Sequence, residues 1–124
     1  MIAWSDDELA KIGEAEELKI TSRRADGSLR RFVTIWCVRL GEDIYVRSAG
    51  GSGNPWFRRA LASVEGRILA GGVERDVAFE EPGPDVAEDL HAAYHTKYDR
   101  YGPEIVGTVV SQEAARSTLR LVPR

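Results

Sequence analysis

The sequence has almost no sulfur and no long apolar run, and each absence excludes a class of protein. Its single cysteine among 124 residues, Cys37, has no disulfide partner within the chain, so a disulfide scaffold is excluded. The longest apolar run covers residues 32–38 and includes a threonine, whereas a membrane-spanning helix needs about 20 apolar residues. The first residues also lack the basic start and apolar core of a signal peptide. We therefore expect a cytoplasmic protein that makes no membrane contact.

Charge is unevenly distributed along a chain whose net charge is −3. Residues 20–47 carry six basic and three acidic side chains, whereas residues 1–19 and 81–104 each carry two basic and six acidic ones. Nucleic-acid binding grows with the number of phosphates that a protein neutralises and is opposed by nearby negative charge. The pattern therefore predicts no nucleic-acid partner and favours one small anion at the basic centre. The length and ordinary composition predict one domain over residues 1–124.

Several segments carry helical signals. Ser5 and Glu8 form a capping box, in which each side chain can bond a backbone N–H of the other residue. Apolar residues from Val86 onward recur every three or four positions until Gly102 and Pro103 end the pattern. The predicted helices are 5–17, 56–63, 85–101 and a short one near 111–116.

Six segments are typical of strands, because they are rich in β-branched and aromatic residues and are separated by glycine-containing turns. Residues 31–40 have apolar side chains on both faces, which predicts a strand that is buried on both sides. The predicted strands are 18–24, 31–40, 44–48, 66–70, 73–79 and 118–122. Their order among the helices predicts a mainly β fold with α-helices (α+β), built as a small antiparallel barrel covered by helices.

Two motifs resemble a known superfamily. They are Arg31-Phe32-Val33-Thr34-Ile35-Trp36 with Arg47-Ser48-Ala49-Gly50-Gly51 further on, and Asn54-Pro55-Trp56-Phe57 at a helix start. They look like the flavin-binding split barrels, which include pyridoxamine-phosphate oxidase-like proteins and deazaflavin-dependent nitroreductases. Over nearly its full length the chain most resembles the uncharacterised bacterial domain-of-unknown-function family 2255. The resemblance implies a six-stranded antiparallel split β-barrel flanked by helices, and a homodimer.

The resemblance also implies a cofactor, FMN or a deazaflavin. In the resembling families a threonine of the second strand and a Ser-x-Gly-Gly loop contact cofactor phosphate. Arginine matches phosphate oxygens with a planar fork, and tryptophans can form the walls of a site for a flat apolar ring. The candidate cofactor-binding residues are Arg31, Thr34, Trp36, Arg47, Ser48, Gly50, Gly51 and Trp56.

Three functions remain open at this point. The first is a small oxidoreductase in which the bound cofactor passes a hydride to a small organic acceptor. The second is a cofactor-free module that holds a small hydrophobic or anionic ligand. The third is a barrel enzyme that uses an empty pocket for acid–base chemistry with a histidine or tyrosine. The sequence assigns no catalytic residue.

The remaining reactive side chains favour structural roles. Glu88, His91, His95 and Asp99 form one helical stripe, and histidines four residues apart can share a metal ion. Structural zinc needs four convergent ligands, which one helical face rarely supplies, so we predict no metal site. The stripe of Tyr94, Tyr98 and Tyr101 predicts core or subunit interface. Cys37 lies in mid-strand and is expected to be an inert small hydrophobe.

Overall fold

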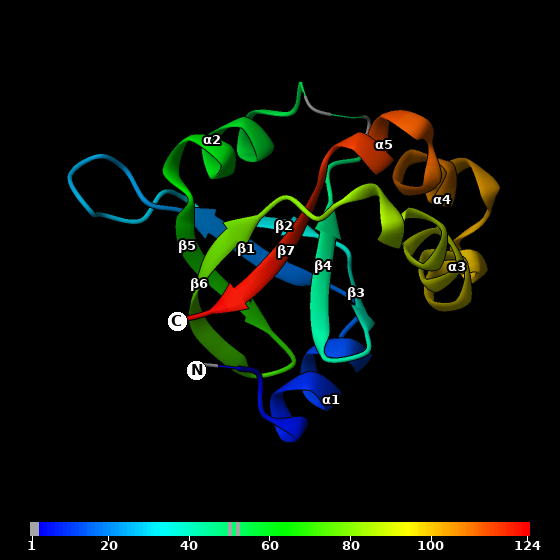
Figure 1. Cartoon of the computed structure of the whole chain (residues 1–124), viewed down its shortest axis with the longest axis horizontal. Helices are drawn as coiled ribbons and strands as arrows, with labels where there is room; N and C mark the ends of the chain where they lie inside the picture. Colours follow the sequence, from blue (N-terminus) through cyan, green and yellow to red (C-terminus); the bar gives the residue numbers. More distant parts are fainter. Residues whose placement is uncertain (1–2, 50, 52) are drawn as a thin grey trace.

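The seven strands of the described residues form one continuous antiparallel sheet, in the order β2-β1-β5-β6-β7-β4-β3 (Figure 1). The computed structural model describes residues 3–49, 51 and 53–124. The strands are β1 (Leu18–Ser22), β2 (Val33–Ile35), β3 (Cys37–Leu40), β4 (Asp43–Arg47), β5 (Glu65–Ala70), β6 (Val73–Glu80) and β7 (Thr118–Pro123). The sheet curls until it nearly closes into a barrel, which confirms the predicted fold class.

Helices flank this barrel. The α-helices are α1 (Asp6–Glu14), α2 (Pro55–Ser63), α3 (Ala87–Tyr98), α4 (Pro103–Val110) and α5 (Gln112–Arg116), with 3₁₀ turns η1 (Pro84–Val86) and η2 (Asp99–Tyr101) on either side of α3. Figure 1 shows α1 at one end of the barrel, α2 near the other, and α3, α4 and α5 together along one side. Within the described residues, no helix combines the length and the apolar character that crossing a membrane requires.

The predicted strand 31–40 is divided at Trp36, which is why the sheet has seven strands and not six. Its first part, β2, pairs with β1, and its second part, β3, pairs with β4 at the opposite edge of the sheet. The prediction that this segment is buried on both sides is correct for β3, where Cys37 and Val38 are both buried. It is wrong for β2, where Val33 is 37% exposed, because β2 is an edge strand that borders an open cleft.

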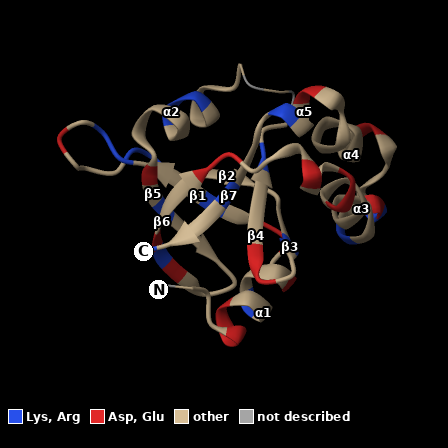
Figure 2. Cartoon of the chain, in the orientation of Figure 1, with Lys and Arg blue, Asp and Glu red and all other residues tan. Residues whose placement is uncertain are grey.

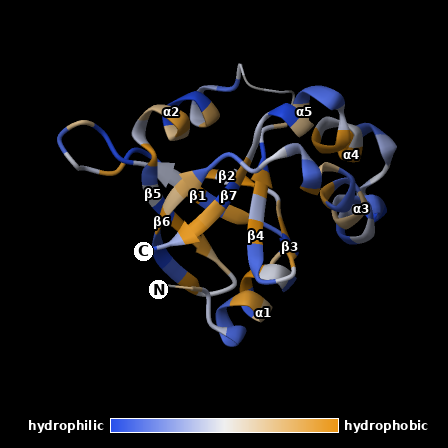
Figure 3. Ribbon diagram, in the orientation of Figure 1, coloured by the Kyte–Doolittle hydropathy of each residue, from blue (hydrophilic) through white to orange (hydrophobic). Residues whose placement is uncertain are grey.

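Two hydrophobic clusters hold the molecule together. The larger one fills the barrel and includes Leu9 and Ile12 from α1 and Phe57 from α2. The smaller one joins the outer face of β3 and β4 to α3 and α4. It contains Val38, Tyr45, Leu90, Tyr94, Tyr98, Val106 and Val109. Figure 3 shows the matching pattern, with hydrophobic residues concentrated along the strands and hydrophilic ones on much of α3 and α5.

Gly66 allows β1 and β5 to lie close together beneath α2. A Cβ at this position would lie 1.9 Å from the carbonyl oxygen of Thr21 and 2.6 Å from the Phe79 ring. No side chain fits in that space, so the close pairing of these two strands requires glycine. The hairpin that follows β1 lies alongside α2.

Candidate functional site

A cleft of about 380 Å³ lies between β2, the start of α2 and α4, and we call it the aromatic cleft. It brings together four of the predicted site residues from separate parts of the chain: Thr34, Trp36, Arg47 and Trp56. The other lining residues are Val33, Ile35, Ala49, Asn54, Ile105, Thr108 and Val109. Most of this lining is apolar, with a few hydroxyl and amide groups, as is usual for sites that bind small organic molecules.

Trp36 is a rigid wall of the aromatic cleft. Its ring stacks on Tyr98 with centroids 4.0 Å apart and planes inclined by 5°. The Tyr98 hydroxyl in turn accepts a hydrogen bond of 3.1 Å from the backbone N–H of Cys37 and lies 2.8 Å from the Glu16 carbonyl, to which it can donate. Burial raises the pKa of Tyr98, so the hydroxyl keeps its proton and these bonds persist at neutral pH.

Trp56 forms a second wall at the first turn of α2. It is almost buried and meets Phe57 edge to face, with centroids 5.9 Å apart. Asn54, the N-cap residue, makes no side-chain capping bond, and its side chain is part of the cleft lining. The first turn of α2 contains no acidic residue, so the positive end of the helix dipole lies uncompensated beside the cleft.

Arg47 is a buried cation beneath the aromatic cleft. Its Nε donates to Thr118 Oγ1 at 3.1 Å, its Nη1 donates to the Val109 carbonyl at 3.0 Å, and its guanidinium lies over the Tyr94 ring at 5.4 Å. None of the ion pairs among the described residues includes it. Burial lowers the pKa of Arg47, and the neighbouring Tyr94 offsets this only in part. These bonds make Arg47 a tie between β4, β7 and α4.

Ser48 and Gly51 form a tight buried turn after β4. The Ser48 hydroxyl donates to the Gly51 carbonyl at 2.6 Å, and the Gly51 N–H donates to the Ser48 carbonyl at 3.1 Å. Gly51 has a φ of 108°, which favours glycine. Neither residue is in the described lining of the aromatic cleft. The predicted site residue Gly50 lies outside the described residues.

Arg31 does not line the aromatic cleft. It lines a small neighbouring cavity of about 20 Å³, which we call the bridging pocket. This pocket shares Val33 and Trp56 with the aromatic cleft. Its basic residues are Arg30, Arg31 and Arg59. The Arg30 Nε atom is buried and has no hydrogen-bond partner in the described part of the chain. An unpartnered buried N–H is costly, so a ligand oxygen here would be stabilising.

Beyond the bridging pocket lies an open groove of about 870 Å³, which we call the arginine groove. It runs between the projecting hairpin of residues 23–30 and the exposed face of α2. Its basic residues are Arg23, Arg24, Arg30, Arg58 and Arg59. Figure 2 shows basic residues both on the hairpin and on α2. Sequence reasoning missed this groove, although the basic excess in residues 20–47 and the Arg58-Arg59 pair both pointed toward it.

The histidine stripe lies on another side of the molecule. The rings of His91 and His95 are 4.6 Å apart, and His95 Nδ1 lies 2.6 Å from Asp99 Oδ1. Across the described residues, no three His, Cys, Asp or Glu side chains converge as metal ligands would. His91 instead lines a cavity of about 510 Å³ between α3 and α5, which shares Arg47 with the aromatic cleft. Cys37 is buried, and burial raises the pKa of its thiol.

The chain matches one protein family over most of its length. The profile of a family described as "Uncharacterized protein conserved in bacteria" matches residues 8–121. The chain belongs to the DUF2255 family. Among curated proteins, none matches this DUF2255 chain significantly.

Solved structures share the fold of the DUF2255 chain at low sequence identity. One is a putative pyridoxamine 5'-phosphate oxidase from Listeria innocua, with a TM-score of 0.64, 15% identity, and coverage of 96% of this chain and 92% of that one. A second is a FAD-binding protein from Mesorhizobium loti, with a TM-score of 0.56, 15% identity, and coverage of 99% and 92%. A third is an F420 reductase, with a TM-score of 0.55, 14% identity, and coverage of 93% and 90%. These matches establish a shared split-barrel fold.

Proposed function

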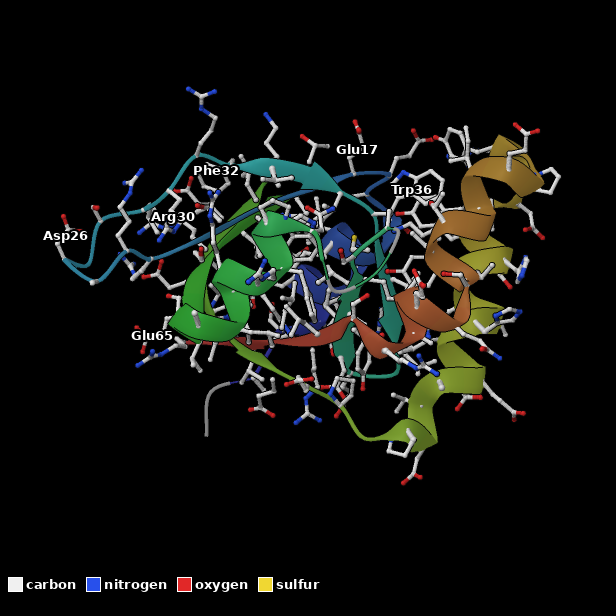
Figure 4. All side chains as sticks on the ribbon, turned by 90° about the horizontal axis from the view of Figure 1, so that it is seen from above. Glu17, Asp26, Arg30, Phe32, Trp36 and Glu65 are labelled. Atoms are coloured by element: carbon white, nitrogen blue, oxygen red, sulfur yellow. The ribbon has the colours of Figure 1, made fainter. Side chains whose placement is uncertain are left out.

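We propose that the protein binds a flavin- or deazaflavin-type coenzyme, with its ring in the aromatic cleft and its phosphate at the mouth of the bridging pocket, where the pocket meets the open arginine groove. One observation carries the proposal, which is that the apolar cleft and the cationic sites adjoin one another. The aromatic cleft shares Val33 and Trp56 with the bridging pocket, which shares Arg30 and Arg59 with the arginine groove. Figure 4 shows Arg30 and Trp36 toward opposite ends of β2. An apolar, aromatic site thus lies next to a cationic one.

The residues present fit such a molecule at both ends. A flat ring needs aromatic or aliphatic walls, which Trp36, Trp56 and Val109 supply. A phosphate needs cations and N–H donors, and the buried, unpartnered Nε of Arg30 offers one. Arg47 contributes less directly than the sequence predicts, since its Nε and Nη1 already bond to the protein.

We infer that the protein acts as a small oxidoreductase. A FAD-binding protein and an F420 reductase share the fold of this chain, and that likeness supports this class. When bound, such a coenzyme supplies the hydride or electron transfer, and the protein supplies binding and orientation. The stack of Trp36 on Tyr98 would hold one ring face and exclude water from it. The use of a single cysteine, Cys37, with no disulfide partner in the chain supports a cytoplasmic setting.

We also propose that a second copy of the chain covers the aromatic cleft. Phe32, Val33 and Ile105 are 36%, 37% and 52% exposed, and the last two belong to the cleft lining. Exposed apolar residues around a ligand site are typical of an interaction surface. A two-fold dimer through this face would bury them and shield the coenzyme ring from water.

The test is titration of the protein with FMN, riboflavin and a deazaflavin, followed by fluorescence. FMN should bind more tightly than riboflavin, and Arg31→Ala and Arg59→Ala should each weaken FMN binding about 10- to 100-fold, because a charge-assisted bond contributes about 1.5–3 kcal/mol. Arg116→Ala, an exposed arginine outside these cavities, is the matched control. Thr108→Trp should fill the cleft and abolish binding. Thr96→Trp, at an exposed position of α3, should leave binding unchanged.

Three outcomes would contradict the proposal. If neither FMN nor the deazaflavin binds at tens of micromolar, the cofactor-free module is favoured. If binding persists in Thr108→Trp, the ring lies elsewhere. If the protein without coenzyme catalyses a reaction that requires His91, the acid–base alternative is favoured, with the cavity between α3 and α5 as its site.

A further inference from the structure

Arg47 is a buried positive charge that the described residues leave without a negative partner. Its side chain is only 2% exposed, and none of the ion pairs in the described part of the chain includes it. A buried arginine is normally paired, because an uncompensated charge away from water is costly. Its contacts with Thr118, Val109 and the Tyr94 ring are all with neutral groups. A carboxylate that reaches the guanidinium would therefore be stabilising.

The cavity between α3 and α5 gives a carboxylate access to Arg47. Arg47 lines this cavity of about 510 Å³, and so does Ala87, the first residue of α3. The Nη2 atom of Arg47 donates to the Ala87 carbonyl at a long distance of 3.5 Å. Across the described residues the guanidinium makes three hydrogen bonds with its five N–H groups. The two remaining N–H groups can donate to a ligand that enters from this side.

The helices that frame the cavity carry negative charge. Glu88 lines the cavity, is exposed, and takes part in no ion pair among the residues that the structure describes. Asp89 in the first turn of α3 and Glu113 in the first turn of α5 add to it, and Figure 2 shows acidic residues on α3. Arg47 is the one lysine or arginine in the described lining. Such surroundings repel a simple anion and attract an ammonium group.

The rest of the cavity lining is mostly apolar. Ala87, Val110 and Ala115 supply aliphatic surface, and Ser111 and Gln112 add a hydroxyl and an amide. The other lining residue beside the two charged ones is His91. The cavity therefore combines a buried cation, an aliphatic wall and an exposed carboxylate. A ligand with a short hydrocarbon stem and two opposite charges is complementary to all three features.

We propose that the cavity between α3 and α5 binds a small amino acid, with its carboxylate on Arg47 and its ammonium group at Glu88. Such a ligand is a zwitterion without net charge, so the acidic helices do not repel it as they would a simple carboxylate. The inference does not rest on the proposed function, because it concerns a different cavity. The two sites meet at Arg47, which also lines the aromatic cleft.

Calorimetric titration of the protein alone with a matched set of four-carbon compounds tests this site. The set is 2-aminobutanoate, 4-aminobutanoate, butanoate and butylamine. At least one of the two amino acids should bind 10-fold or more tightly than both butanoate and butylamine, because only a zwitterion pairs with both charges of the cavity. The tighter of the two amino acids gives the spacing between the carboxylate and ammonium positions.

Variants of the lining assign the binding to this cavity. Glu88→Gln should weaken amino acid binding about 10-fold without weakening butanoate binding, since it removes an attraction for the ammonium group and a repulsion of the carboxylate. Asp89→Asn, an exposed position outside the lining, is the matched control and should stay within about twofold. Ala115→Phe should fill the cavity and abolish binding. Ala92→Phe, at an exposed position of α3 outside the lining, should leave binding unchanged.

A further variant tests the inner end of the cavity. Arg47→Lys keeps the buried charge but replaces the planar fork with a single ammonium group, so it should weaken the binding of the amino acids and of butanoate alike, by about 10-fold. Melting curves of each variant establish that the fold is intact. If Arg47→Lys does not fold, the Glu88→Gln and Ala115→Phe titrations decide alone.

The outcomes separate this inference from the proposed function. If butanoate binds as tightly as both amino acids, or if Glu88→Gln leaves amino acid binding unchanged, the zwitterion is overturned. If no amino acid binds at millimolar concentration, or if binding persists in Ala115→Phe, the cavity is not an amino acid site. Ala115→Phe should leave FMN binding within about twofold, because Ala115 lies outside the aromatic cleft and the bridging pocket. Failure of FMN to bind would overturn the coenzyme and leave the amino acid site standing.

Discussion

A single strained residue ends α2. Val64 has a φ of 66°, and no other residue in the described part of the chain, apart from glycines, has a positive φ. Its backbone N–H donates to the Ala60 carbonyl, as a residue that ends a helix in the left-handed conformation should. Valine is poorly suited to this conformation because its branched Cβ crowds the backbone. Its side chain is 52% exposed and gains little from burial.

Val64→Gly should therefore stabilise the protein. Removing the left-handed strain is worth about 1–2 kcal/mol, and the greater freedom of glycine in the unfolded chain offsets part of it, which leaves a gain of about 1 kcal/mol. Urea unfolding followed by circular dichroism measures the change. Ala62→Gly, an exposed position within the same helix, should destabilise by about 0.5–1 kcal/mol. A loss of stability in Val64→Gly would show that valine is not strained there.

The site residues differ in how far the sequence could predict them. Thr34, Trp36 and Trp56 lie in contiguous motifs, and the structure brings them into one cleft. Arg58 and Arg59 could not be assigned in the same way, because their groove forms only when α2 packs beside a hairpin about 30 residues earlier in the chain. A pattern along the sequence does not reveal such a tertiary neighbour.

The first helix is anchored by its capping box and by one ion pair. Ser5 N–H donates to Glu8 Oε1 at 2.9 Å, and Glu8 N–H donates to Ser5 Oγ at 3.1 Å. Arg75 Nη1 from β6 lies 2.8 Å from the same Glu8 oxygen. The bond from Ser5 N–H is the main factor that holds the pKa of Glu8 below its usual 4.5, and Arg75 adds to it. Glu8 thus couples the helix cap to the sheet.

The contribution of Glu8 to stability should depend on pH. A carboxyl with a lowered pKa in the folded state stabilises fully above its unfolded value, and this stabilisation is lost as pH falls through the folded pKa. At pH 7 the free energy of unfolding of the wild type should exceed that of Glu8→Gln by about 1 kcal/mol. The difference should begin to shrink as the pH approaches 4.5 and should vanish only below the lowered pKa of the folded state. Thermal unfolding from pH 7 to 3 measures it, with Glu14→Gln on the same helix as control. A stability difference between wild type and Glu8→Gln that does not change with pH would contradict this role of Glu8.

The boundary of a helix or strand could be predicted where residues next to it determine it, as the capping box determines the start of α1. Two elements escaped prediction. The division between β2 and β3 falls at Trp36, whose ring stacks on Tyr98, a residue 62 positions later in the chain that leaves no local signal. The helix α4 begins at Pro103, which the sequence reading took as a stop after α3. Proline fits the first turn of a helix equally well, so the same residue both ends one helix and starts the next.

At the scale of the whole molecule, the proposed dimer makes a definite prediction. Sedimentation equilibrium at micromolar concentration should give twice the 13.7 kDa mass of one chain. Ile105→Asp places a charge in the proposed interface and should yield monomers, because burying an unpaired carboxylate is costly. Leu61→Asp is the control, since Leu61 is similarly apolar and 38% exposed but lies on α2 outside the cleft lining. A wild-type mass of one chain would refute the dimer.

The position of β7 between β6 and β4 determines when the barrel can close during synthesis. Of the described strands β7 leaves the ribosome last, yet it provides partners for Val77 on one side and Ile44 on the other. Until it emerges, β4 and β6 each expose an edge of unpaired N–H and C=O groups, and Trp4 lacks the Leu121 carbonyl that its indole N–H bonds in the folded chain. Without β7 the strands can form only a four-stranded sheet, β2-β1-β5-β6, and a separate hairpin, β3-β4, so this is the interval in which the nascent chain is most exposed to aggregation.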